Sequence, residues 1–442
     1  MIFLILPNQL FQETHEHLKK FKYNEIWIVE EPHYFSTSLI KPNKIKIAYL
    51  RACMQYYYDN LIKSGFKVIY KDFLNSSLLK DEEYYSYELT DHKLKDKYEK
   101  QGIIINEIVT PMFILKKDDL DIYNRRKTIS HSSFYEYSKK KLAILEGVKN
   151  QDIYNRSNPH EEVKLNPLYF VNKNNIIYYE EAIKYANNFN NHIGNPTLET
   201  LGIYPISSKD AYNAYEFFLK NNLKNFGLFQ DVIQISNPLM YHSIISPMLN
   251  IGLLIPIKLI KIIKKYEEIM DLRNYEGFIR QVIGWREYMR YLYLYKYDKL
   301  LDNTYGNNKR LGKEWYSATT GLIVLDNEIS NAINYGYTHH IIRLMVFLNF
   351  MIISEIRPED IYKWFMEVVS IDAYDWVMIP NIYSMGYFSK IGMKRPYLSS
   401  SNYIIKMSNY EKDGKWDVIW DNKFREFVKS RKINFYLRSI KK

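Results

Sequence analysis

The first 120 residues alternate between short apolar runs and a longer stretch with helical spacing. Apolar runs of strand length fall in residues 2–10, 25–31 and 66–73, while residues 44–65 repeat apolar positions at helical intervals and end in a glycine. Strands that alternate with helices are typical of a doubly wound parallel sheet, whose ligands bind at the carboxyl ends of the strands. No GxGxxG motif follows the first run, so the sequence does not support a dinucleotide phosphate site there.

The remaining chain changes character twice. Residues 121–200 are polar and rich in asparagine, which is typical of a long connection. We therefore expect an α/β doubly wound domain over residues 1–120, a connecting segment over 121–200 and an all-α domain over 201–442. The helical period dominates the third of these regions in the stretches 210–223, 255–270, 275–295, 339–356 and 358–369.

Cysteine content and hydropathy narrow the class of protein. Cys53 is the only cysteine, which excludes intramolecular disulfides and suits a reducing compartment. The longest strongly apolar run, residues 344–353, is far shorter than the roughly 20 residues of a membrane helix. The apolar opening lacks a basic leader and is not typical of a signal peptide. We expect a soluble intracellular monomer, in the cytoplasm or the nucleus, without membrane contact.

The net charge and the aromatic content of the chain are compatible with a nucleic-acid partner. The net charge is +11, the kind of balance with which nucleic-acid-binding proteins displace counterions from phosphates. Aromatic residues make up 16% of the chain and supply surfaces on which a nucleobase or a flavin can stack. Composition therefore permits a nucleic-acid partner without selecting it.

Two adjacent histidines, His339 and His340, open an apolar helical stretch. Neighbouring residues on a helix point about 100° apart, whereas helical zinc ligands stand at i and i+4, and the chain has no HExxH motif. We therefore predict no metal site here. An imidazole at the mouth of a central helix can instead donate a proton in a buried cleft. The residues alone leave open the alternative that both histidines cap the helix or satisfy core hydrogen bonds.

Three further stretches combine polar and aromatic side chains. Residues 241–254 set hydroxyl groups, a proline and an asparagine ahead of a basic helix, a pattern that suits a phosphate. Residues 278–290 bring three arginines next to a tryptophan. Residues 372–381 place two aspartates and an asparagine at a transition from helix to loop, where carboxylates can accept hydrogen bonds from a ring N–H or a hydroxyl. Each stretch taken alone also fits a solvated or capped helix.

As an ordered set, these stretches carry a family resemblance. They resemble the photolyase and cryptochrome superfamily, most closely the iron-sulfur bacterial cryptochromes, also called prokaryotic (6-4) photolyases. The amino-terminal LILPNQL and VEEPHYF are similar to the antenna domain of this group, so the resemblance covers nearly the whole chain. The other matching stretches are YHSIISPMLNIGLL, FIRQVIGWREYMR, YTHHIIRLM, WFMEV, DAYDWVMIPN and RPYLSSSNYIIKMS.

The resemblance implies an FAD-dependent DNA photolyase, a lyase that uses light to pass an electron from reduced FAD to a pyrimidine dimer in UV-damaged DNA. It slightly favours the (6-4) photoproduct over the cyclobutane dimer as the substrate. The helical domain would hold the flavin. The cofactor-binding residues that it implies are Tyr241, His242, Ser243, Ser246, Arg280, Trp285, Arg343, Asp372, Asp375 and Asn381.

The resemblance also implies roles in proton and electron transfer. His340 would protonate the lesion, and His339 would orient it. Trp364 falls on the family's relay tryptophan, and Tyr316 replaces the usual surface partner in that relay. Trp376, with Trp315, could substitute in the relay. A tyrosine can pass an electron if its proton has an acceptor.

Antenna and lesion-side residues follow from the same resemblance. Relatives bind a ribityllumazine chromophore in the amino-terminal domain, and Gln9 and Glu31 match the contacting positions, although PNQL departs from the commoner GDQL. Asp152 matches a linker acid on the lesion side. One acid alone is a weak magnesium site, so no metal is expected.

The chain departs from the family where the iron-sulfur cluster binds. Val324, Glu411 and Gly414 occupy positions that are cysteines in the relatives, so no iron-sulfur cluster is expected. Met378 stands where some relatives carry a glutamate beside the flavin. This loss leaves the choice between the two lesions open, as the sequence also does for single- and double-stranded DNA.

Two other functions remain open at this level. A cryptochrome-type blue-light photoreceptor would hold FAD and repair nothing. A nucleic-acid-binding protein with a degenerate flavin pocket would be colourless and still bind DNA.

Purified protein should contain no stoichiometric iron, because Cys53 cannot supply the several thiolates that hold a cluster. Elemental analysis of the protein measures this directly. Iron present at one or more atoms per chain would overturn the argument from cysteine content.

Overall fold

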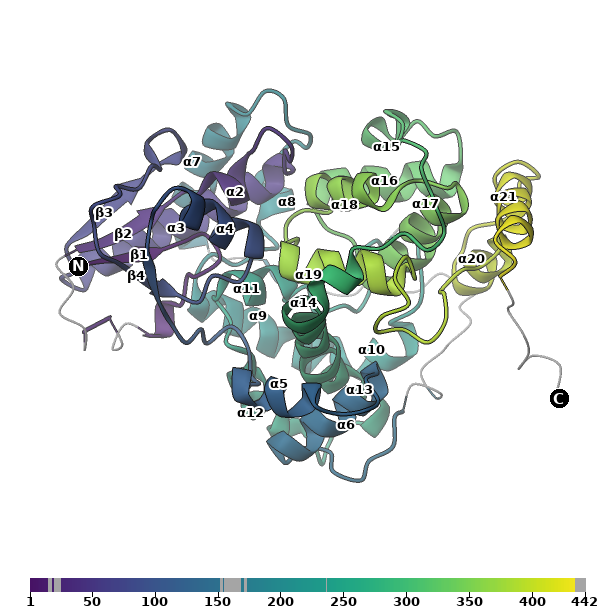
Figure 1. The fold of residues 1–442 in the computed structure, drawn as a ribbon, viewed down its shortest axis with the longest axis horizontal. Helices are drawn as coiled ribbons and strands as arrows, with labels where there is room; N and C mark the ends of the chain where they lie inside the picture. Colours follow the sequence, from purple (N-terminus) through teal and green to yellow (C-terminus); the bar gives the residue numbers. More distant parts are fainter. Residues whose placement is uncertain are drawn as a thin grey trace.

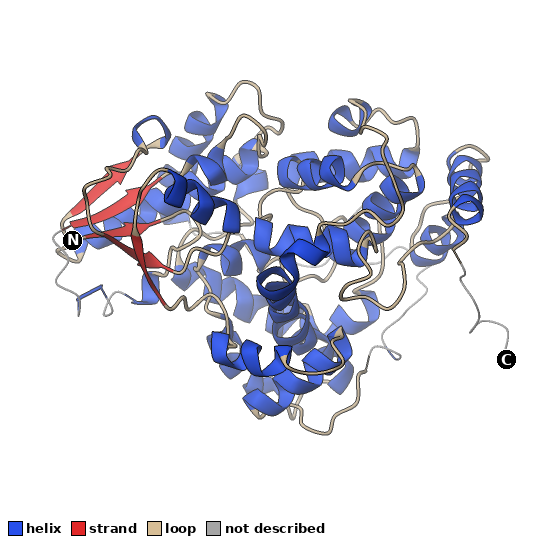
Figure 2. Cartoon of the chain, in the orientation of Figure 1, coloured by secondary structure: helices blue, strands red, loops and turns tan. Residues whose placement is uncertain are grey.

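The computed structural model describes residues 1–14, 18–19, 25–151, 154, 168–170, 173–235 and 237–433. The strands gather at one end of the molecule near the amino terminus, and α21 (Trp416–Ser430) lies at the opposite end (Figure 1). Helices fill the space between them (Figure 2). The predicted fold class, an α/β doubly wound sheet followed by an all-α region, is confirmed.

The sheet has five parallel strands in the order β3-β2-β1-β4-β5. The order reverses between β1 and β4, and this is the point where ligands of doubly wound sheets bind. Ile2 of β1 pairs with Glu25 on one side and with Tyr84 on the other. All four residues of β1 are buried, as expected for a central strand that is covered on both faces. The strands are β1 (Ile2–Ile5), β2 (Glu25–Val29), β3 (Val68–Lys71), β4 (Tyr84–Tyr87) and β5 (Ile105–Ile108).

Helices and short 3₁₀ turns connect the strands and lead to the helical region. Up to residue 201 they are η1 (Gln12–Thr14), α2 (Pro32–Phe35), α3 (Lys44–Lys63), η2 (Phe73–Asn75), α4 (His92–Lys100), α5 (Lys117–Asn124), α6 (His131–Leu142), η4 (Lys173–Asn175), α7 (Ile176–Asn187) and α8 (Leu198–Leu201). The helical region then contains α9 (Ser208–Asn221), α10 (Leu223–Phe229), α11 (Ser246–Ile251), α12 (Pro256–Ile263), η5 (Lys264–Tyr266), α13 (Leu272–Ile279), α14 (Glu287–Leu300), α15 (Glu314–Ser317), α16 (Ile323–Tyr335), α17 (Asn349–Ile353), α18 (Pro358–Glu367), α19 (Asp375–Pro380), α20 (Ser401–Met407) and α21.

Three π-helical segments interrupt the helical region. The first joins α13 to α14, the second runs directly into α17, and the third follows α19 without a break. A π-turn inserts an extra residue into a helix and is found frequently at functional sites. The segments are η6 (Arg280–Arg286), η7 (Ile342–Leu348) and η8 (Asn381–Met385).

The segment predicted to be a connection contains α7, which packs on α3. The Tyr178 hydroxyl donates to Asp59 at 2.6 Å, and Arg51 of α3 forms an ion pair with Glu181 at 2.8 Å. Part of this segment therefore extends the amino-terminal domain. The domain boundaries themselves stay a prediction.

The carboxyl-terminal end closes around two tryptophans. Trp416 and Trp420 are fully buried, and their ring centroids lie 6.2 Å apart. Trp420 also packs on Phe350 of α17 at 4.7 Å. This packing forms an apolar core at the carboxyl-terminal end of the described chain. Among the described helices, none is both long and apolar enough to cross a bilayer.

Asn43 joins the two parts of the molecule. Its side chain caps α3 by accepting from the Ile45 N–H at 2.9 Å and donates to the Ile333 carbonyl at 2.8 Å. Ser370, across the domain junction, accepts a hydrogen bond from the Asn43 N–H. Gly194 has φ +88°, and a Cβ there would lie 1.9 Å from Asn43 Oδ1, so this close approach requires glycine.

Replacing Asn43 with alanine should lower the free energy of unfolding by about 2–4 kcal/mol. The change removes a helix cap, which contributes about 1 kcal/mol, and leaves a buried carbonyl without its donor. Urea unfolding measures the loss. The matched control is Ser207→Ala, which removes only the cap of α9 and should cost about 1 kcal/mol. Equal losses in the two variants would contradict the role given to Asn43.

Candidate functional site

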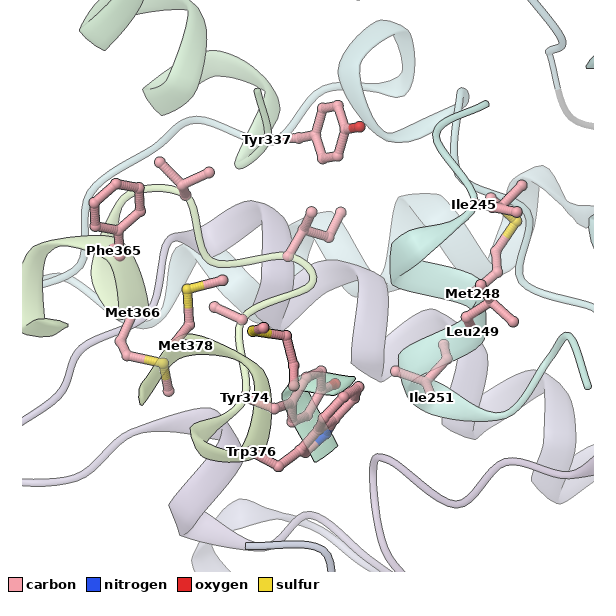
Figure 3. Close-up of a cluster of buried hydrophobic side chains, with 14 of the residues drawn as sticks. Ile245, Met248, Leu249, Ile251, Tyr337, Phe365, Met366, Tyr374, Trp376 and Met378 are labelled. Atoms are coloured by element: carbon pink, nitrogen blue, oxygen red, sulfur yellow. The ribbon is translucent and has the colours of Figure 1, made fainter. Parts of the chain in front are cut away.

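A cavity opens in the middle of the helical region. Its volume is about 250 Å³. Ile245 and Leu249 lie on one side of the region, and Phe365 and Trp376 lie on the other (Figure 3). The wall is mostly apolar and carries a small number of polar and charged groups, which is typical of a site for a cofactor or another small molecule.

All three π-helical segments contribute to the cavity wall. η6 supplies Gln281, Trp285 and Arg286, η7 supplies Arg343, and η8 supplies Asn381, among others. The extra residue in each π-turn alters which side chains face the cavity compared with a regular helix. Three such turns line a single cavity, so the shape of the cavity wall depends on departures from regular helix geometry.

The main charged feature of the wall is an ion pair between Arg343 and Asp372. Arg343 binds the carboxylate with both terminal nitrogens, at 2.9 and 3.1 Å, and its Nε donates to the Thr338 carbonyl at 2.6 Å. The Ser246 hydroxyl donates to the same carboxylate at 2.6 Å. These contacts fix both charged groups at one side of the cavity.

A second arginine, Arg286, enters the wall from η6. It donates to the Met112 carbonyl at 2.7 Å and to Asn250 at 3.2 Å, and its guanidinium lies over the rings of Phe113 and Trp376. Burial lowers its pKa to about 10, so it stays charged at neutral pH. Its Nε has no hydrogen-bond partner in the described part of the chain.

Three imidazoles stand together beside the ion pair. His242 and His339 are stacked, with ring centroids 4.6 Å apart and planes 11° from parallel. Burial lowers the pKa of His242 to about 3 and holds that of His339 well below its usual value. His340 is exposed to the cavity, and desolvation by the surrounding cavity wall together with the nearby Arg343 charge lowers its pKa to about 4. All three imidazoles are therefore neutral at pH 7 in the cofactor-free protein.

Most of the predicted site residues converge on this cavity although they are far apart in the sequence. Trp285, in η6, lies near His340, with 6.0 Å between the two ring centroids. Cavity-lining residues among those predicted are His242, Ser243, Ser246, Trp285, His340, Arg343, Asp372, Trp376 and Asn381.

Apart from the predicted relay residues, four residues predicted for the flavin and lesion site lie outside the cavity wall. Tyr241 stacks on Phe229 instead. Arg280 faces Glu276 at 3.4 Å, one helical turn away. His339 packs behind the wall against His242.

The fourth residue is Asp375. Its carboxylate accepts a short hydrogen bond from Tyr362 and forms an ion pair with Lys93 at 3.2 Å, so it points toward the amino-terminal domain. Asp152 lies outside the described residues.

Sequence reasoning did not select Asn250, Arg286 or Tyr337, all of which line the cavity. All three lie inside the stretches that carry the family resemblance, but helical periodicity did not show that they face inward.

The predicted relay residues form an aromatic cluster next to the cavity. Phe365 lines the cavity and contacts Trp364, with ring centroids 5.1 Å apart. Trp364 is fully buried, meets Trp315 edge to face at 5.6 Å, and donates its indole N–H to the Trp315 carbonyl at 2.8 Å. Tyr316 follows directly and reaches the partly exposed side of this cluster. Trp376 is separate from it and belongs to the cavity wall.

The two predicted antenna residues do not meet at one cavity. Glu31 lines a cavity of about 280 Å³ in the amino-terminal domain and accepts hydrogen bonds from Tyr98 and Lys97. Gln9 is buried at the point where the strand order reverses. There it donates to the Tyr87 carbonyl at 2.9 Å and accepts from Ser86, so its own contacts fill the crevice between β1 and β4.

Within the residues that the structure describes, no three histidine, cysteine, aspartate or glutamate side chains are grouped as metal ligands.

Comparison with known sequences gives a family match. The family model of deoxyribodipyrimidine photo-lyase-related proteins matches residues 3–199. The (6-4) photolyase of Agrobacterium fabrum is 33% identical over 297 residues, which are 64% of this chain and 58% of that protein. The matched region therefore spans less than two thirds of that relative.

Comparison with solved structures gives the same fold. A class III photolyase from Agrobacterium tumefaciens superposes with a TM-score of 0.63 at 15% identity, over 98% of this chain and 88% of that one. A cryptochrome from Synechocystis gives a TM-score of 0.62 at 15% identity, over 98% and 89%. In its sequence matches and in its fold, the chain is similar to proteins of the photolyase/cryptochrome-like family.

Proposed function

We propose that this protein is an FAD-dependent DNA photolyase that repairs UV-induced pyrimidine dimers, with the (6-4) photoproduct slightly favoured over the cyclobutane dimer. The observation that carries the proposal is the convergence of His340, the Arg343–Asp372 ion pair and Trp376 on one deep cavity. The (6-4) photolyase relative supports the choice of reaction.

The chemistry of the cavity wall fits FAD. Apolar side chains such as Leu249, Val282 and Met378 suit the faces of an isoalloxazine ring. Trp376 Nε1 and Arg286 Nε are buried donors without partners among the described residues, and they could donate to carbonyl, hydroxyl or phosphate oxygens of the cofactor. Arg343, Ser246 and Asn381 would complete the polar contacts. Reduced FAD, when bound, supplies a light-driven electron to the lesion.

His340 is the group we assign to proton transfer. Its ring is exposed to the cavity, and it is neutral at pH 7 before a cofactor binds because desolvation by the cavity wall and the Arg343 charge disfavour the imidazolium. A negatively charged ligand in the cavity would raise the pKa of His340 by favouring its charged form. Proton donation would then be coupled to occupation of the site.

DNA binding would use the surface downstream of η8. Lys390, Lys394 and Arg395 are exposed in the segment that follows this cavity-lining turn. Cations there can contact phosphates on either side of a damaged pyrimidine that has left the base stack, and such binding is sensitive to salt. The expected monomeric state is compatible with this arrangement.

A ribityllumazine-type antenna is a further part of the proposal. The cavity beside Glu31 offers a carboxylate, Lys97 and Gln101, which can bind a polar heterocycle. Gln9 would need to give up its bonds to the sheet before it could contact a ligand.

One observation favours a second candidate, a cryptochrome-type photoreceptor without repair activity. Met378 lines the cavity where some relatives carry a glutamate, so Asp372 is the only carboxylate among the described lining residues, and it is already paired with Arg343. The cavity then has fewer groups that can move protons. The (6-4) lesion needs proton transfer, so this difference bears on repair.

The decisive experiment is an absorbance spectrum of purified protein, followed by blue-light incubation of its reduced form with (6-4) and cyclobutane-dimer oligonucleotides separately. A flavin spectrum with restoration of either substrate would support the photolyase and identify its lesion. A flavin spectrum without repair would favour the photoreceptor. Protein without bound flavin that also fails to bind added FAD would contradict both.

His340→Ala should leave FAD binding intact and lower (6-4) repair by roughly a hundredfold or more, the range that a positioned general acid contributes. Any cyclobutane repair should fall less. Repair per absorbed photon measures the effect. The control is His92→Ala, which removes an imidazole of the amino-terminal domain that stacks on Tyr293. Unchanged (6-4) repair in His340→Ala would remove the assigned role.

The pH dependence of (6-4) repair follows from the low pKa of His340. The pKa of His340 is about 4 before the cofactor binds, and although an anionic cofactor would raise this pKa, the protonated fraction still increases as the pH falls through the neutral range. Repair should therefore rise from about pH 8 to about pH 6, and the slope should vanish in His340→Ala. Repair that increases with pH in the parent protein would contradict proton donation by this group.

A further inference from the structure

Tyr316 is joined to the buried relay tryptophan through the backbone. The indole N–H of Trp364 donates to the Trp315 carbonyl at 2.8 Å, and that carbonyl belongs to the peptide group between Trp315 and Tyr316. One hydrogen bond and the covalent bonds of Tyr316 thus link the indole to the phenol ring. The route is fixed because Trp364 is fully buried and Trp315 nearly so.

The Tyr316 hydroxyl has a carboxylate partner on the same helix as Trp364. It donates to Glu367 Oε2 at 2.9 Å, and Glu367 stands three residues after Trp364 at the end of α18. The Glu367 side chain is only 7% exposed. Its other oxygen accepts from the Lys41 N–H at 2.9 Å and lies 3.6 Å from Lys363 Nζ, so the carboxylate is held in place from the amino-terminal domain as well.

A polar cavity opens in front of this pair. Its volume is about 490 Å³, and Tyr316 and Glu367 share its wall with Lys41, Arg310 and Lys363. It is separate from the cavity lined by His340, and the aromatic cluster lies between Phe365 on one wall and Tyr316 on the other. Water or a small soluble molecule can therefore reach the outer end of the cluster.

Oxidation of a tyrosine requires a place for its proton. Burial, and then the Glu367 charge, raise the pKa of the Tyr316 phenol, so the phenol keeps its proton at rest. Losing an electron makes the phenol strongly acidic, and a carboxylate at hydrogen-bond distance is positioned to accept the proton.

We propose that Tyr316 and Glu367 form the proton-coupled end of the electron relay, with Tyr316 as the terminal donor and Glu367 as its proton acceptor. The inference rests on the proposed function, in which a photoexcited flavin takes an electron from Trp364. One electron then passes from Tyr316 to the Trp364 radical cation. The O–H bond of Tyr316 breaks, the proton moves to Glu367 Oε2, and the products are neutral Trp364, a neutral tyrosyl radical and a protonated Glu367.

Flash photolysis of the FAD-loaded protein with oxidised flavin tests the proposal, followed by absorbance and electron paramagnetic resonance. The parent protein should form a tyrosyl radical after a tryptophan radical, and formation should be slower in deuterated water. Tyr316→Phe should stop at the tryptophan radical. Glu367→Gln keeps an oxygen that can accept the hydrogen bond but cannot take up the proton, so the tyrosyl radical should form roughly a hundredfold more slowly.

The matched control is Tyr178→Phe, which removes another tyrosine that is hydrogen-bonded to a carboxylate, at 2.6 Å from Asp59, in the amino-terminal domain. It should behave as the parent. The same tyrosyl signal in Tyr316→Phe, or an unchanged rate and isotope effect in Glu367→Gln, would overturn the inference while leaving the proposed function intact. Flavin that is bound but never photoreduced in any of the proteins would overturn the relay together with its photochemical basis.

Discussion

The site depends on the ion pair between Arg343 and Asp372, which is nearly buried in the wall of the central cavity. Two charges in such a place are stable only with good geometry and further hydrogen bonds, and both conditions are met here by the bidentate contact, Ser246 and the Thr338 carbonyl. The bonds tie α11, η7 and the loop before α19 together. They thereby fix the relative positions of three segments that line the cavity.

The same charges determine the protonation of the neighbouring histidines. Arg343 adds to the effect of burial on His340, and the stacked His242 and His339 remain neutral behind it. The cavity wall thus presents a net positive charge from its two arginines and one aspartate, with a neutral imidazole facing inward. An anionic cofactor would compensate this charge, which links cofactor binding to the readiness of His340 to carry a proton.

The sequence predicted the architecture well because the hydrophobic periodicity of each element, and the order of the elements, can be read from short stretches of the chain. Alternating strand and helix patterns gave the parallel sheet, and the apolar helical stretches gave the second region. The cavity-lining residues were harder to separate from their neighbours. Asp372 lies in the loop three residues before Asp375, the first residue of α19, yet only Asp372 faces the cavity, because Tyr362 and Lys93 bind Asp375 from the other side.

A single sequence carries no signal for contacts between residues that lie far apart along the chain. The π-turns that bring Arg286 and Asn381 inward break the regular helical period on which the prediction relied. Gln9 matched a ligand-contacting position by resemblance, but its amide is taken up by β4. Glu367 pairs with Tyr316 across 51 residues, and neither residue type nor spacing indicated that contact.

The most direct test of the central claim is a crystal structure of the protein with FAD bound. The account predicts that the flavin occupies the cavity between Trp376 and the Arg343–Asp372 pair, with His340 facing the space left for a substrate. A flavin bound elsewhere on the chain, or the same cavity closed by side chains in a protein that carries flavin, would contradict it.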